Sequence, residues 1–204
     1  MSVVVEPKQK FSEAAFDELS LYRLSVEDYE KMIAHGFFDE DERIELWEGV
    51  LIKMSPKGIK HRNATYLAST FFQEKFGRTV IVQSQDPIKL SDFSEPEPDV
   101  VLAIAPLSKY AAGHPTPKDV LLVMEIADTS VQKDRRKSQS YAQNGIVQYL
   151  LLNLNTGEIE DYREPGFEGY RFVKTYSKDE TFNLVAFPEI EIKVSDFLPP
   201  ESEE

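Results

Sequence analysis

Hydrophobic and polar positions follow one another in stretches whose periods predict both strands and helices. Around Glu48 and Gly49, the stretch 43–55 alternates apolar and polar residues, which predicts a β-hairpin. Runs that are apolar or β-branched predict further strands at 79–84, 98–104, 119–127 and 147–154. Helices are predicted at 25–36, 61–77 and 131–145, from the helical spacing of apolar residues or from residues that cap or end a helix.

The order of these elements predicts an α/β fold. The stretch 119–127 is apolar enough to be covered on both faces, as a central strand is. Another hairpin is expected at 147–164, and two more β stretches follow at 170–177 and 190–197. We expect a central mixed β-sheet flanked by helices, with additional antiparallel hairpins. The expected organisation is a flexible N-terminal arm at 1–20, one domain at 21–198 and an acidic tail at 199–204.

Composition narrows the classes of function. The chain has no cysteine, which excludes disulfides, thiolate zinc sites and a cysteine nucleophile. Its net charge of −13 argues against broad non-specific binding of nucleic acid, although it leaves room for a local basic groove. The sequence shows no signal peptide and no apolar run of the roughly 20 residues that span a bilayer, so we expect a cytoplasmic protein.

Two carboxylates lie where predicted strands begin or end. Asp99 opens the strand at 98–104, and Glu125 follows five apolar residues in the strand at 119–127. The connection between them is long enough for the two strands to be neighbours, in which case both carboxylates could face one metal ion. Because an unpaired buried charge is costly, Glu125 needs a metal, a proton or a cationic side chain. A purely structural ion pair would involve one of the four basic residues of the next helix: Lys133, Arg135, Arg136 or Lys137.

Four blocks of sequence, taken in order, resemble the PD-(D/E)XK nuclease superfamily. They are "IELWEGVLIKMSPKG", "QDPIKLSDFSEPEPDVVL", "HPTPKDVLLVMEIADTS" and "DRRKSQSYAQNGIVQYLLLNL". More specifically, the chain resembles a bacterial, Uma-type family of restriction-endonuclease-like proteins over about residues 25–195. The resemblance implies a restriction-endonuclease-like fold and a metal-dependent DNA endonuclease that hydrolyses phosphodiester bonds.

Carried over residue by residue, the resemblance assigns four candidate catalytic residues. Asp99 takes the "PD" position and Glu125 the "(D/E)" position, and these two would hold Mg²⁺, for which Mn²⁺ would substitute. The lysine expected two residues later is replaced by Ala127. The helix that follows would supply the lysine instead, as Lys137 or, in competition with it, Lys133. The hairpin acid of the family corresponds to Glu45, with Glu48 as the alternative.

Positive and amide side chains near these residues suggest how DNA would be bound. Lys57, Lys60, His61 and Arg62 form the best local positive patch, at the start of a predicted helix whose N-terminus attracts phosphate. A solvated loop explains each lysine alone equally well. Gln83 and Gln85 could support the metal site or contact the edge of a DNA groove. The expected partner is double-stranded DNA, with a homodimer as a further option and no membrane.

A second class of function stays open. The missing lysine at position 127 and the acidic net charge also suit a catalytically degenerate nuclease fold that serves as a binding or assembly module.

Overall fold

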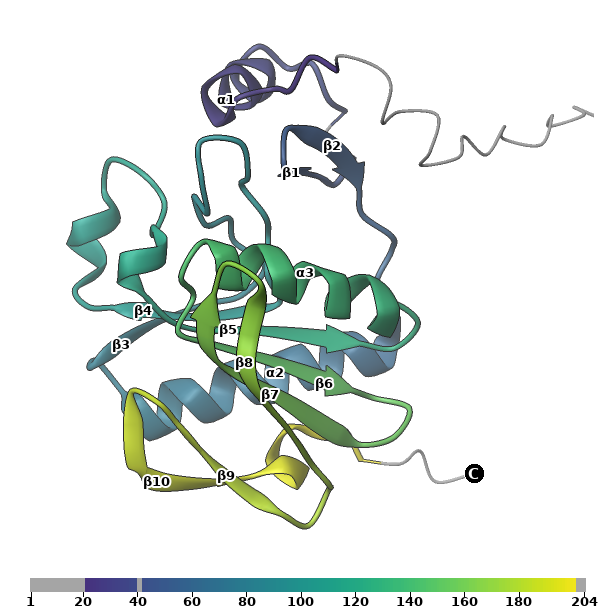
Figure 1. The fold of residues 1–204 in the computed structure, drawn as a ribbon, viewed down its shortest axis with the longest axis vertical. Coiled ribbons are helices and arrows are strands. Elements are labelled where there is room, and N and C mark those ends of the chain that lie inside the picture. Colours follow the sequence, from purple (N-terminus) through teal and green to yellow (C-terminus); the bar gives the residue numbers. More distant parts are fainter. Residues whose placement is uncertain (1–20, 40–41, 201–204) are drawn as a thin grey trace, which may run out of the picture.

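The computed structural model describes residues 21–39 and 42–200, and Figure 1 shows their arrangement. The helices are α1 (Val26–Ala34), α2 (Ile59–Phe76) and α3 (Val131–Gln143). The strands are β1 (Ile44–Trp47), β2 (Val50–Lys53), β3 (Val80–Gln83), β4 (Val100–Ile104), β5 (Val120–Ala127), β6 (Gln148–Asn153), β7 (Glu158–Gly166), β8 (Gly169–Tyr176), β9 (Thr181–Leu184) and β10 (Phe187–Lys193). The arm expected at 1–20 and residues 201–204 of the expected tail lie outside the described residues.

Six strands form one mixed sheet in the order β3-β4-β5-β6-β7-β8. Strands β5 and β6 are parallel and are joined through α3, whereas every other neighbouring pair in this sheet is antiparallel. The hairpins β1–β2 and β9–β10 form two further two-stranded sheets. The predicted α/β fold with a central mixed sheet and additional antiparallel hairpins is confirmed.

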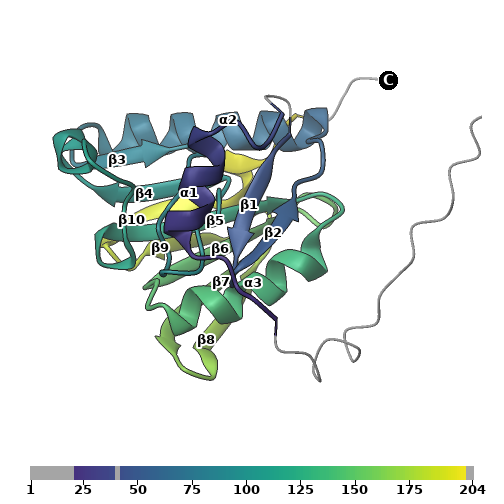
Figure 2. The same cartoon turned by 90° about the horizontal axis from the view of Figure 1, so that it is seen from above.

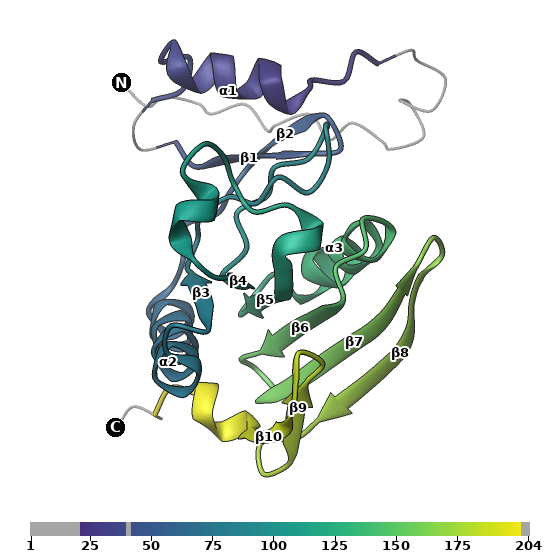
Figure 3. The same cartoon turned by 90° about the vertical axis from the view of Figure 1, so that its left-hand side faces the viewer.

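Helices cover both faces of the sheet, and β5 lies between them (Figure 3). Side chains along a strand point alternately to opposite faces. In β5, Leu122, Met124 and Ile126 pack in the cluster that contains the apolar side of α2. The alternate residues Val123 and Ala127 pack in the cluster that contains Tyr141 of α3. Glu125 has the same parity as Val123 and Ala127, so this carboxylate faces α3.

A small N-terminal layer lies above the α3 side of the sheet (Figure 2). Its own apolar cluster joins Val26 and Tyr29 of α1 to Leu46 of the β1–β2 hairpin. Ser25 caps α1 by accepting a hydrogen bond from the Asp28 N–H at 3.1 Å, as its sequence position predicts. Because Leu46 points into this cluster, the neighbouring positions of β1 point toward α3 and the sheet.

The C-terminal segment differs from its predicted form. Strand β9 was not predicted, and β structure expected over 190–197 ends at Lys193, where a 3₁₀ turn (Val194–Phe197) begins. The turn is favoured because Asp196 accepts a hydrogen bond from the Lys193 N–H at 3.2 Å and Phe197 packs on the rings of Phe71 and Phe72 in α2. Burying Phe197 thus takes precedence over the β propensity of its neighbours.

No helix in the described part of the chain is long and apolar enough to cross a membrane.

The tight turn of the β1–β2 hairpin depends on Gly49, and this dependence can be measured. Gly49 has φ +78°, and a Cβ built on it would lie 2.5 Å from the Cβ of Arg23. Gly49→Ala should lower the free energy of unfolding by about 3 kcal/mol, because it adds a steric clash to an unfavourable backbone conformation. Gly145→Ala is the matched control, since Gly145 has φ +79° with no atom within 4 Å of the added Cβ, and it should cost about 1 kcal/mol. Equal losses in urea denaturation would contradict a special role for the turn.

Candidate functional site

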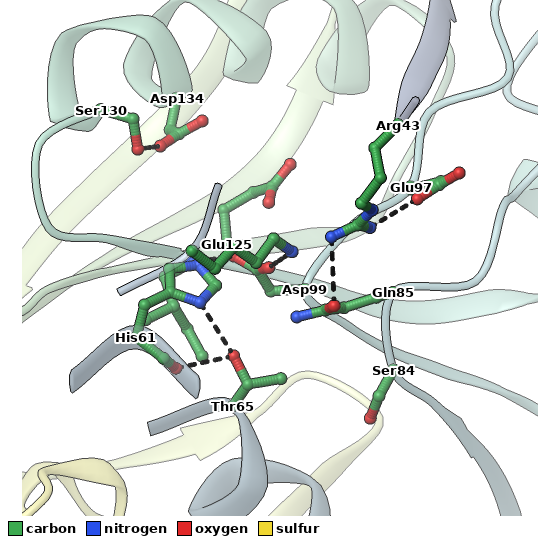
Figure 4. A network of polar contacts seen from close by, with 12 residues as sticks. Arg43, His61, Thr65, Ser84, Gln85, Glu97, Asp99, Glu125, Ser130 and Asp134 are labelled. Carbon is green, nitrogen blue, oxygen red and sulfur yellow. Dashed lines mark hydrogen bonds and ion pairs between the residues drawn. The ribbon is translucent and has the colours of Figure 1, made fainter. Parts of the chain in front are cut away.

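A cleft of about 560 Å³ opens where the β1–β2 hairpin, the start of α2, the end of β5 and the start of α3 meet. Its lining is rich in charge. The acidic residues are Glu45, Glu97, Asp99, Glu125, Asp128 and Asp134, and the lysines are Lys57, Lys133 and Lys137, with His61 beside them. Figure 4 shows His61, Asp99 and Glu125 gathered in the middle of this group. The cleft therefore contains most of the residues that the sequence singled out.

Asp99 and Glu125 are brought together by the antiparallel pairing of β4 with β5. Val100 lies opposite Met124 in this pair, so one step further along the register Asp99 lies opposite Glu125. Residues that are directly opposite in an antiparallel pair share a face. The N–H of Ile126 donates a hydrogen bond of 2.9 Å to Asp99 Oδ2, which fixes the first carboxylate against the second strand. The expectation that the two strands are neighbours is confirmed.

Asp99 is held by a lysine from the segment before α2 and by a histidine of α2. Lys57 Nζ lies 2.6 Å from Asp99 Oδ1, and His61 Nε2 lies 2.9 Å from Asp99 Oδ2. Burial alone would raise the pKa of Asp99, but the His61 hydrogen bond and the Lys57 charge outweigh it and hold this pKa below its ordinary value. Asp99 is therefore ionised at neutral pH.

Glu125 is paired with the lysine that the family resemblance selected. Lys137 Nζ lies 2.9 Å from Glu125 Oε1, and the Tyr141 hydroxyl donates to the same oxygen at 3.1 Å. Burial raises the pKa of Glu125 to about 8; Lys137 opposes the rise, and nearby carboxylates, Asp99 first among them, add to it. Burial would lower the pKa of Lys137, yet Glu125 and Glu45 raise it above its ordinary value. Lys137 is therefore positively charged at neutral pH.

The β1–β2 hairpin completes the surroundings of Lys137. Glu45, which is 1% exposed, has Oε1 3.3 Å from Lys137 Nζ and 3.6 Å from Lys133 Nζ, but this oxygen accepts no hydrogen bond from the described residues. The ring of Trp47, two residues further along β1, lies 5.2 Å from the same ammonium group in a cation–π contact. Trp47 also meets Tyr141 edge-on, with ring centroids 5.5 Å apart. The hairpin thus fixes the lysine from the side opposite to β5.

The donor set has the chemistry that a divalent cation requires. Asp99, Glu125 and Glu45 each offer carboxylate oxygens to one cleft, and such hard oxygens are what Mg²⁺ and Mn²⁺ prefer. The Glu45 oxygen that accepts no hydrogen bond from the described chain is open to a cation. Within the described residues, no group of three acidic or histidine side chains is arranged so that it could hold a metal ion. The contacts explain this, because lysines and His61 already engage both Asp99 and Glu125.

The remaining predicted residues lie away from the carboxylate pair. Glu48 is in the hairpin turn and lines a different hollow, so Glu45 is the hairpin acid in the cleft. Lys60 lines a neighbouring hollow of about 800 Å³, and Arg62 is an exposed residue of α2. The two glutamines lie outside the cleft lining. Gln83 Oε1 is buried without a hydrogen bond from the described residues, and Gln85 Oε1 accepts from Arg43 at 3.4 Å (Figure 4).

Three residues that matter for the geometry were not singled out from the sequence: Trp47, Asp134 and Tyr141. Asp134 is buried in the cleft and accepts a hydrogen bond from the Ser130 hydroxyl. Burial raises its pKa, although the Ser130 bond and the Lys137 charge oppose the rise. The spacing of Asp134, Lys137 and Tyr141 by three and four positions, which puts them on one helix face, was the signal available.

Glu95 is a second kind of buried carboxylate, outside the cleft lining. It is 3% exposed, its N–H donates to the Leu46 carbonyl at 2.8 Å, and its Oε1 lies 3.2 Å from His114 Nε2. Burial is the main reason that the pKa of Glu95 is raised to about 7. The segment between β3 and β4, which pairs with β1 at Leu46, therefore contains a carboxylate that holds its proton more tightly than an exposed one.

Comparisons with known proteins agree with the fold. The sequence model of the Uma2 family, described as "Putative restriction endonuclease", matches residues 26–195. The crystal structure of a protein from Anabaena variabilis, described as "a putative nuclease belonging to DUF820", superimposes with a TM-score of 0.66 at 15% sequence identity. The match covers 85% of this chain and 97% of that one. None of the curated proteins matches the sequence.

Replacing Lys137 should reveal how strongly the fold depends on it. Lys137→Met should lower the free energy of unfolding by about 3 to 5 kcal/mol, because it leaves the buried carboxylates of Glu125 and Glu45 without their cation. Arg135→Met, two positions earlier on α3, is the control: its ion pair with Glu160 is partly exposed and should contribute less than about 1 kcal/mol. Adding Glu125→Gln to Lys137→Met should restore part of the loss. Denaturant unfolding measures the stability of all three variants. Similar losses for Lys137→Met and Arg135→Met would contradict the prediction.

Glu95 predicts a pH dependence of stability. Its pKa is about 7 in the folded protein against an ordinary value of 4.5, so between these pH values the folded state keeps a proton that the unfolded state has lost. Stability from this group is therefore fully present below pH 4.5 and is lost as the pH rises to about 7. Relative to wild type, Glu95→Gln should gain about 2 to 3 kcal/mol between acidic and mildly alkaline pH. Exposed Glu189→Gln is the control, and parallel pH profiles of wild type and Glu95→Gln would refute the assignment.

Proposed function

The chain belongs to the Uma2 family, and from that premise and the geometry of the cleft we propose that it is a metal-dependent endonuclease that hydrolyses phosphodiester bonds in double-stranded DNA. The observation that carries the proposal is the position of Asp99 opposite Glu125 with Lys137 on the second carboxylate. Both carboxylates and the lysine line one cleft, as a hydrolytic site would require. The description of the Anabaena variabilis neighbour as a nuclease is in keeping with this proposal.

Lys137 would replace the lysine that is missing at position 127. Ala127 lies on the same face of β5 as Glu125, and its small side chain packs in the cluster that contains Tyr141 of α3. The ammonium group of Lys137 reaches Glu125 from this helix at 2.9 Å. The helix thus brings to the carboxylate pair the cation that the strand lacks.

The charges of the side chains favour distinct tasks in hydrolysis. Bound Mg²⁺, or Mn²⁺ in its place, would make a water more acidic and neutralise charge that develops on the phosphate. Asp99 and Glu125 would hold the metal, with Glu45 as a third source of oxygen. Because Lys137 stays protonated, it cannot accept a proton from water, and its task is to donate hydrogen bonds that orient the water and stabilise the phosphate oxygens. Lys133, whose Nζ lies 3.6 Å from Glu45 Oε1, would add positive charge to the cleft.

The surface beside the cleft offers groups for a DNA backbone. Lys60 and Arg62 are exposed on the first turns of α2, close in the chain to Lys57 and His61. Gln83 and Gln85 would act only as outer supports of the site. A homodimer would present one cleft to each strand of the duplex, and a DNA substrate is consistent with a cytoplasmic location.

A second candidate function is a nuclease-fold binding or assembly module without catalysis. It is favoured by the lysine and histidine contacts that already occupy Asp99 and Glu125. Calorimetry with Mn²⁺ separates the two candidates. Heat of binding that disappears in Asp99→Asn and in Glu125→Gln supports the endonuclease, and wild type without such heat supports the module.

A plasmid assay tests the endonuclease directly. Wild type with Mg²⁺ or Mn²⁺ should nick or linearise supercoiled plasmid, and chelation should stop it. Glu125→Gln should lower the rate by at least about a hundredfold, because it removes a metal oxygen while keeping the side-chain shape. The control Glu160→Gln changes a glutamate outside the cleft lining, in the partly exposed pair with Arg135, and should retain the rate. Equal nicking by Glu125→Gln and wild type would refute the proposal.

A further inference from the structure

Lys57 is held differently from Lys137, a second lysine in the cleft. Its ammonium group lies 2.6 Å from Asp99 Oδ1, and its side chain is 13% exposed. The residue belongs to the segment 54–58 between β2 and α2, which forms neither helix nor strand. No backbone N–H of residues 55–58 donates a hydrogen bond to another described residue. Among the described contacts, Lys57 is therefore held in place mainly by Asp99.

Lys137 is fixed more completely. It projects from α3, contacts both Glu125 and Glu45, and packs against the ring of Trp47. Its side chain is 8% exposed. Of these two lysines, Lys57 is the one that a competing cation can release with fewer contacts broken.

The excess of negative charge in the cleft makes the release of Lys57 relevant to phosphate binding. Carboxylates in the lining outnumber lysines two to one, so a phosphate that enters without a metal meets an excess of negative charge. A divalent cation bound by Asp99 would compete with Lys57 for the same carboxylate. It would reduce the negative charge of the lining and would also free the lysine.

We propose that Lys57 is a phosphate-binding residue that becomes available only when a divalent cation takes its place on Asp99. Metal and DNA then bind cooperatively, because each favours the state in which Lys57 has left Asp99. The inference rests on the proposed endonuclease function and adds to it an order: metal first, DNA second. His61, the other partner of Asp99, projects from the first turn of α2.

Calorimetry with Mn²⁺ in the absence of DNA tests the competition. Lys57→Met removes the competing charge and should bind Mn²⁺ about tenfold more tightly than wild type, in line with the loss of one charge-assisted hydrogen bond. Lys118→Met removes the same charge from a residue outside the cleft lining and should bind Mn²⁺ as wild type does. Lys57→Arg keeps a competing cation and should not gain affinity. If Lys57→Met does not fold by circular dichroism, Lys57→Gln replaces it, with a smaller gain expected.

Fluorescence anisotropy of a labelled DNA duplex tests whether a bound cation makes Lys57 available to DNA. Ca²⁺ is used because it also prefers oxygen ligands, and a denaturing gel confirms that the duplex stays intact. Ca²⁺ should strengthen duplex binding by wild type and by Lys118→Met by about tenfold or more. Lys57→Met should lose most of this Ca²⁺-dependent gain, because its phosphate-binding cation is absent.

The outcomes separate this inference from the proposed function. If wild type binds Mn²⁺ through Asp99 and cuts plasmid, but Lys57→Met binds Mn²⁺ no more tightly than Lys118→Met, the inference is overturned and the endonuclease stands. An equal Ca²⁺-dependent gain in Lys57→Met and wild type overturns it as well. Wild type that neither binds Mn²⁺ nor cuts DNA overturns both.

Discussion

The burial of Glu125 in the middle of the sheet is the constraint on which the rest of the site depends. It is the single charged residue of β5, and an uncompensated carboxylate in such a place would cost several kcal/mol. Compensation comes from Lys137 and Tyr141, which lie on one face of α3 and so fix the rotation of that helix over the sheet. Trp47 then packs against both of these side chains, which sets the position of the β1–β2 hairpin. Core packing and site geometry are therefore parts of one arrangement.

Different surroundings shift the pKa values of the two opposed carboxylates in opposite directions. Asp99 sits at the start of β4, within reach of Lys57, His61 and a backbone N–H, and its pKa is lowered. Glu125 is enclosed on the α3 side, and desolvation raises its pKa despite the nearby Lys137. Like charges placed side by side repel, so dividing the cations between the two residues allows both to remain in one cleft. Perturbed pKa values of this kind, in a cleft, are typical of functional sites.

Much of this arrangement could be predicted from the sequence, and the exceptions have physical causes. The apolar run of β5 and the hairpin around Gly49 are local patterns, so their elements were predictable. The length of the connection allowed Asp99 and Glu125 to meet, and the pairing of β4 with β5 brings them together. The contacts of Lys57 and His61 with Asp99 depend on where α2 begins relative to β4, which no local pattern encodes. These two side chains, expected at a DNA phosphate, both contact the Asp99 carboxylate in the structure.

The position of the lysine shows why the order of motif residues along a sequence can differ between proteins that build the same site. A lysine at position 127 would lie on the face of β5 that carries Glu125, where α3 now packs against Ala127. The proposed hydrolysis would need a cation at hydrogen-bonding distance from the carboxylate pair, whichever element supplies it. A helix residue can meet that requirement as well as a strand residue, provided the helix is fixed by other contacts. Here Tyr141 and Trp47 provide the fixing, so the departure at position 127 leaves the chemical requirement intact.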